Sequence, residues 1–138
     1  MVYLFTMDMG MLVGMLEDGT TDAILAGALG MGKGMLYEAL IADALYKRGG
    51  RLFDFAKESG LELDFVINYL GNSPILEVRA RDGNAKSAKT VMAHPDRCGK
   101  TELIRIKDSN LGVSDGILTI PHYMAHLLFS WGAMLPHE

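Results

Sequence analysis

The sequence has little cysteine, little proline and no long apolar run that is free of charge. Cys98 is the only cysteine among 138 residues, so no disulfide can form within the chain. A chain without disulfides suits a reducing compartment, and we therefore expect a cytoplasmic location. The mostly apolar residues 1–16 are interrupted by Asp8, and no lysine or arginine precedes them. They fit neither a secretory signal nor a membrane span of about 20 apolar residues, so no membrane partner is expected.

Positive charge is scarce as well. The chain has 13 basic and 17 acidic residues, and its formal net charge is −4. This balance argues against nucleic acid or an anionic lipid surface as the main partner. The apolar fraction of 49% and the charged fraction of 22% are typical of a folded globular protein. Because no repeat, low-complexity segment or linker interrupts the chain, we expect residues 1–138 to form a single domain.

Methionine, in contrast, is abundant, with ten residues in the chain. Methionine fills irregular apolar space because its side chain is unbranched and flexible. Two interpretations stay open: a loosely specified helical core, or a surface that packs on a partner subunit or an apolar ligand. Besides the first residue, the cluster near the N-terminus comprises Met7, Met9, Met11, Met15, Met31 and Met35.

The first half of the chain has the spacing of helices. Thr20, Thr21 and Asp22 offer an N-cap, and apolar residues then recur at helical spacing as far as Leu45. The basic and glycine residues 47–50 end this pattern as a helix C-terminus would. A shorter helix is predicted over residues 52–58, whereas residues 2–7 fit a strand or a helix equally well.

The second half has the texture of a sheet that a final helix covers. Alternating apolar residues and turn signals predict strands over residues 65–69, 75–80, 89–93 and 103–107. Short connections favour antiparallel neighbours, so we expect a four-stranded antiparallel meander. A polar loop follows, and then a helix over residues 121–134 whose apolar stripe packs on the sheet. Helices, then a meander, then a helix predict the α+β class.

A glycine cluster provides the first candidate site. Residues 27–34 nearly match the phosphate-binding pattern, but Gly34 stands where a serine or threonine would hold magnesium. Gly99-Lys100-Thr101 is a second near match, in which His94 replaces the first glycine. We therefore expect a close helix crossing or a break between two helices instead. Together with two aromatic residues of the last helix, the candidate ligand-binding residues are Gly30, Gly32, Lys33, Tyr123 and Trp131.

Histidine and cysteine provide the second candidate site. His122 and His126 are four residues apart on the predicted last helix and would share a face, and His94 and Cys98 have the same separation in a predicted loop. These four side chains could complete a tetrahedral zinc site. Cys98 could also be a nucleophile with His94 as its base. In the competing interpretation, His122 and His126 are partly buried residues that form hydrogen bonds.

The order of elements over about 100 residues resembles the 4-vinyl reductase domain, a small-molecule-binding module. The similar features are the glycine-containing helix over residues 27–45, the segment 55–61, the strand ending at Ser109, and the aromatic-rich helix 122–131. The resemblance implies an apolar ligand pocket between helices and sheet, and often a dimer. The cysteines that this family has near and after its last helix are absent here, so no metal-binding residue is carried over.

These observations favour one function and leave an alternative open. The excess of methionine and the lack of a catalytic signature predict a regulatory module or a module that binds a small apolar ligand. We expect this module to form a homo-oligomer. The alternative is a small enzyme whose histidine and cysteine residues, or whose metal site, are assembled at a subunit interface.

Overall fold

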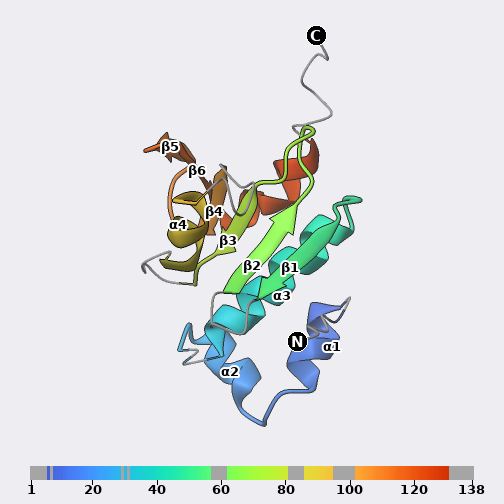
Figure 1. The fold of residues 1–138 in the computed structure, drawn as a ribbon. Helices are drawn as coiled ribbons and strands as arrows, with labels where there is room; N and C mark the ends of the chain where they lie inside the picture. Colours follow the sequence, from blue (N-terminus) through green and yellow to red (C-terminus); the bar gives the residue numbers. More distant parts are fainter. Residues whose placement is uncertain are drawn as a thin grey trace.

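A computed structural model describes residues 6, 8–28, 30, 32–56, 62–80, 86–94 and 102–130. This part of the chain contains both helices and strands, which confirms the mixed class expected from the sequence (Figure 1). The details differ from the expected meander, and the differences determine where the polar residues of the candidate site meet.

The sheet has six strands among the described residues, in the order β1-β2-β3-β4-β6-β5. β1, β2 and β3 are antiparallel neighbours, and β5 and β6 form an antiparallel hairpin. β4, in contrast, is parallel to both β3 and β6. The antiparallel four-stranded meander is therefore wrong. The strands are β1 Leu52–Ala56, β2 Glu62–Ile67, β3 Ile75–Val78, β4 Leu103–Lys107, β5 Gly112–Ser114 and β6 Ile117–Pro121.

β3 and β4 are parallel neighbours because the segment between them is a helix, whereas the sequence suggested a strand. Residues 89–93 were expected in the sheet, but helix α4 spans Lys86–Met92. Ala88 and Val91 are three residues apart, and both are buried against Ile75 and Leu103. A helix between two strands provides the crossover that parallel neighbours need. Because residues 89–93 are not a strand, β4 lies directly beside β3 and parallel to it.

Two further segments were also misassigned. Residues 52–56 form β1 rather than a helix, and Leu52 lies opposite Ile67 of β2. Residues 112–114, expected in a loop, form β5 of the hairpin. Asp115 and Gly116 connect its strands, and both have positive φ, 52° and 73°. Two central residues of positive φ define the type I′ turn that suits a two-residue hairpin.

The helical pattern expected from residue 20 to residue 45 is present as two helices, and a further helix that the sequence did not indicate precedes them. α1 spans Met9–Gly14, α2 spans Thr20–Leu25 and α3 spans Lys33–Tyr46. Figure 1 shows α3 lying along the sheet, with α1 and α2 at its N-terminal end. Gly27 ends α2 with a φ of 67°, and the backbone N–H of Ala28 donates to the carbonyl oxygen of Ala23 at 2.8 Å. This is a glycine-terminated helix end, so the glycine cluster is a break between two helices.

The core lies between α3, the sheet and the C-terminal segment. Ile41 and Leu45 of α3 pack against Phe65 of β2, and Ala125 and Leu128 are fully buried in the same cluster. The C-terminal helix is predicted correctly in position but not in type. Residues His122–Leu127 form the 3₁₀ helix η1, and α-helical geometry begins at residue 128. The expected helix past residue 130 lies outside the described residues.

Candidate functional site

The three mutually parallel strands end at one edge of the sheet. Arg79 directly follows β3, Asp108 follows β4, and His122 follows β6. Ligand sites in sheets with parallel strands are found preferentially beyond the carboxyl ends of those strands. His122 Nε2 lies 2.9 Å from the backbone carbonyl oxygen of Arg79. Because a carbonyl oxygen can only accept, Nε2 carries the proton, and Nδ1 of the neutral ring keeps its lone pair.

The first two turns of α3 cover this edge. The ring centroid of Tyr37 lies 4.2 Å from that of His122, and the two planes are tilted by 41°. Lys33 Nζ lies 5.6 Å from the Tyr37 ring centroid. Lys33 and Tyr37 are four residues apart and therefore share a face of the helix. An ammonium group, a phenol ring and an imidazole thus lie in one row, which we call the polar row.

Burial is the main cause of the lowered pKa of His122. The positive charge of Lys33 lowers this pKa further, whereas the hydrogen bond to Arg79 and the charge of Asp108 raise it. With a pKa below its usual 6.5, His122 is neutral at pH 7. Lys33 therefore contributes the positive charge of the polar row at this pH.

An apolar pocket adjoins the polar row. It lies between α1, α2 and α3 and has a volume of about 270 Å³. Lys33 and Tyr37 belong to its wall, so the pocket and the polar row share two side chains. The remaining lining residues carry no charge and are Met9, Val13, Ile24, Gly27, Leu36 and Leu40.

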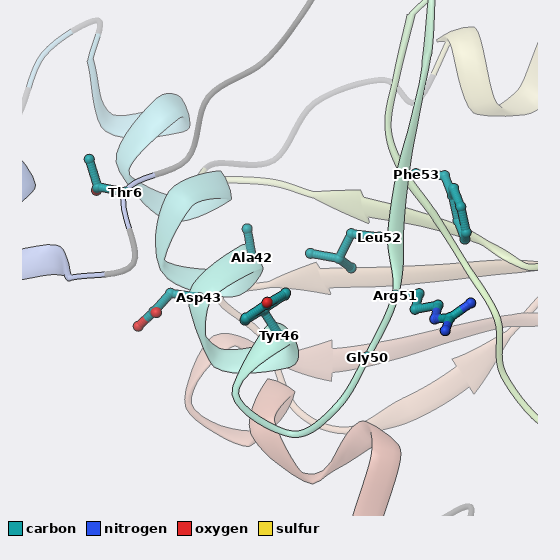
Figure 2. A pocket seen from close by; sticks show the side chains of 8 residues that line it. All are labelled: Thr6, Ala42, Asp43, Tyr46, Gly50, Arg51, Leu52 and Phe53. Carbon is teal, nitrogen blue, oxygen red and sulfur yellow. The ribbon is translucent and has the colours of Figure 1, made fainter.

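A second pocket of about 440 Å³ lies at the other end of α3, beside β1 (Figure 2). Asp43 and Tyr46 of α3 face it together with Leu52 of β1. Asp43 is 9% exposed, and its Oδ2 accepts a hydrogen bond from Lys47 Nζ at 2.7 Å. The charge of Asp43 is therefore already paired within the chain. Its other oxygen, Oδ1, is buried without a hydrogen-bond partner among the described residues. Since Oδ1 is also closed to water, a ligand in this pocket would not reach it in the observed conformation.

Paired charges also lie on the face of the sheet that carries Glu77. Glu77 of β3 is 3% exposed and forms salt bridges with Arg79 and with Arg105, whose Nε lies 3.2 Å from Glu77 Oε2. Asp64 Oδ2 accepts a hydrogen bond from the backbone N–H of Val78 at 2.7 Å, and burial raises the pKa of Asp64. Burial also raises the pKa of Glu38, and the charge of Asp64 raises it further. Glu77 and Arg105 lie directly opposite each other in parallel strands. We therefore interpret the ion pairs of Glu77 as contacts that hold the strands together rather than as a functional site.

The structure brings one of the expected ligand-binding residues to the pocket. Lys33 lines it, whereas Gly30 and Gly32 precede α3 and are not among the lining residues. Tyr123, expected to face inward, is 76% exposed, and Trp131 lies outside the described residues. Tyr37 was not among the residues expected from the sequence, although its spacing of four residues from Lys33 indicates a shared helix face.

The predicted zinc site receives no support from the described residues. No group of three or more His, Cys, Asp or Glu side chains among them could hold a metal ion. His122 and His126 lie on a 3₁₀ helix, where four residues span about 480°, so their side chains point roughly 120° apart. His94 is exposed at the end of α4, and Cys98 lies outside the described residues. The site that includes Cys98 stays a prediction, whereas His122 fits the interpretation of a partly buried, hydrogen-bonded residue.

Comparisons with protein-family models, with curated proteins and with solved structures found no match. No helix of the described part of the chain is long and apolar enough to cross a membrane. The function of the chain is therefore inferred from the geometry of the site itself.

The lowered pKa of His122 predicts a pH effect on stability. Between the folded pKa and about 6.5, the folded chain binds fewer protons than the unfolded chain, so the free energy of unfolding falls as the pH falls through this window. His122→Gln removes the titrating ring and should reduce this fall. Urea unfolding at pH 7.5 and pH 5 measures the effect.

His126→Gln is the matched control because His126 has no hydrogen bond among the described residues. Burial raises the pKa values of Asp64 and Glu38. Above a pH of about 4, their effect on the free energy of unfolding therefore has the opposite sign. They are present in all three proteins, so the difference between the variants isolates His122. The same pH dependence in His122→Gln and in the unmodified chain would contradict the assignment.

Proposed function

We propose that this chain binds a small apolar ligand in the pocket between α1, α2 and α3. The observation that carries the proposal is the pocket itself, whose walls are uncharged except at Lys33. Concave sites with mostly apolar walls and a few convergent polar groups are the usual form of small-molecule sites.

The poor burial of α1 and α2 supports this proposal. Neither helix contains a buried residue, although Val13 and Ile24 belong to the pocket wall. A ligand between them and Leu36 would remove apolar surface from water, at about 25 cal/mol per Å². Met9 suits such a wall because methionine adapts to the shape of its neighbour.

Filling the pocket tests the proposal. In Val13→Phe, a larger side chain occupies space that the ligand would use, and we expect affinity for octanoate and for 1-octanol to fall at least tenfold. Ligand-observed NMR titrations measure both affinities, and a thermal unfolding curve shows that the variant folds.

Met11→Phe is the matched control for this test. Met11 is 64% exposed, and its position is turned by about 200° from Met9 around the axis of α1. The same aromatic side chain there should leave affinity unchanged. The proposal fails if the unmodified chain binds neither octanoate nor 1-octanol, or if Val13→Phe binds them as tightly as the unmodified chain does.

Self-association and the enzymatic alternative stay predictions. Exposed Met11, Met15 and Leu25 offer apolar surface on the N-terminal helices, and light scattering of the purified chain would measure its oligomeric state. The alternative with Cys98 as nucleophile depends on a residue outside the described part of the chain.

A further inference from the structure

We propose that the ligand is an apolar monocarboxylate whose carboxylate group pairs with the ammonium group of Lys33. This inference rests on the proposed function and adds the chemical class of the ligand. It follows from the position of Lys33 relative to the pocket, to the polar row and to the other charges of the N-terminal helices.

Lys33 is the cation that the pocket wall offers to a ligand. It is the first basic residue of the chain, so α1 and α2 contribute no lysine or arginine. Among the described residues, no carboxylate lies within 4.0 Å of Lys33 Nζ, whereas Lys47 on the same helix is paired with Asp43. Lys33 is a partly buried residue. An ammonium group that lacks an anion is stabilised when a ligand brings one.

The neighbours of Lys33 favour an anion of charge −1. His122 is neutral at pH 7 and adds no second positive charge. Phosphate groups carry more charge and are usually held by several backbone N–H groups at a strand-to-helix turn. Here the glycine cluster connects two helices instead, and Gly34 replaces the hydroxyl residue of the phosphate-binding pattern. One ammonium group beside uncharged walls fits a carboxylate with an apolar body.

The volume of the pocket limits the size of this body. A pocket of about 270 Å³ lies just below the usual size of ligand sites, which begins at roughly 300 Å³. It equals about nine water volumes at roughly 30 Å³ each, which suits a ligand of the size of octanoate.

Three ligands of equal length and different charge test the inference: octanoate, 1-octanol and octylamine, each titrated calorimetrically at pH 7. We expect octanoate to bind about tenfold more tightly than 1-octanol, because one charge-assisted pair is added, and octylamine to bind most weakly. In Lys33→Met, which keeps an apolar side chain of similar length, octanoate and 1-octanol should bind equally. Lys33→Arg should restore the preference for octanoate.

Lys89→Met is the matched control, because Lys89 is an exposed lysine of α4 and is not among the residues of the pocket wall. It should keep the full preference for octanoate. If Lys33→Met does not fold, Lys33→Gln provides the same comparison with a polar, uncharged side chain.

The outcomes separate this inference from the proposed function. If the unmodified chain binds 1-octanol as tightly as octanoate, or if the variant without Lys33 keeps the preference for octanoate, the inference is wrong and the pocket remains a binding site. If none of the three ligands binds, the proposed function fails, and the inference fails with it.

Discussion

Phe65→Ala is expected to cost about 3–5 kcal/mol of the free energy of unfolding. Phe65 is 2% exposed and is one of the largest fully buried side chains. It extends from β2 into the cluster that also contains Ile41 and Leu45 of α3. Removing its ring leaves a cavity in a core that cannot fully collapse. Since total stabilities are about 5–15 kcal/mol, this is a large share.

Phe53→Ala is the matched control on the neighbouring strand. Phe53 of β1 lies opposite Val66, the residue next to Phe65, but it is 54% exposed. Its removal should cost about 1 kcal/mol or less, since little packing is lost. Urea unfolding of both variants measures the difference. Equal losses in the two variants would contradict the assignment of the buried face of the sheet.

Glu77→Ala is expected to cost about 3 kcal/mol, at the lower end of the range for breaking a buried ion pair. The substitution removes the partner of both Arg79 and Arg105 and leaves two partly buried guanidinium groups. The side chains of these arginines are 32% and 20% exposed, so water compensates for part of the loss. Chemical denaturation at pH 7 measures the effect.

A double variant separates lost pairing from lost packing. Glu77→Leu combined with Arg105→Met replaces the facing charges of β3 and β4 by apolar side chains. Replacing a buried pair in this way is often neutral or stabilising. Because Arg79 still loses its partner, the double variant should recover part of the lost stability. If the double variant is less stable than Glu77→Ala, the ion pair itself stabilises the parallel strands, contrary to this expectation.

Long periodic segments were predictable from the sequence, and short ones were not. The region of α3 was recognised because its apolar residues recur over several turns before the basic and glycine residues 47–50. Residues 52–56 and 86–92 are five and seven residues long, too short for periodicity to separate a helix from a strand. The second error also removed the crossover helix, and with it the reason to expect parallel strands. The Asp115-Gly116 hairpin signal was present but was assigned to a loop.

The candidate site was predictable only in part. Lys33 stood out because of the glycines around it, and the structure places it on the pocket wall. The contact between Tyr37 and His122 joins α3 to the residue after β6, and no local pattern encodes such a tertiary contact. It also depends on the parallel direction of β6, which sequence reasoning did not find. His122 and His126 point apart because residues 122–127 form a 3₁₀ helix rather than the expected α-helix. Tertiary packing determines this helix type, and no local pattern encodes it.

Methyl resonances of the methionines report directly whether octanoate enters the pocket between α1, α2 and α3. Met9 lies on the pocket wall, whereas Met11 and Met15 are 64% and 73% exposed and are not part of it. With ¹³C-methyl methionine and assignments from single Met→Leu variants, octanoate is titrated into the full chain at pH 7. We expect the Met9 methyl resonance to shift until the site saturates, while those of Met11 and Met15 stay in place. An unmoved Met9 resonance at saturating octanoate, or shifts confined to Met11 and Met15, would contradict this expectation.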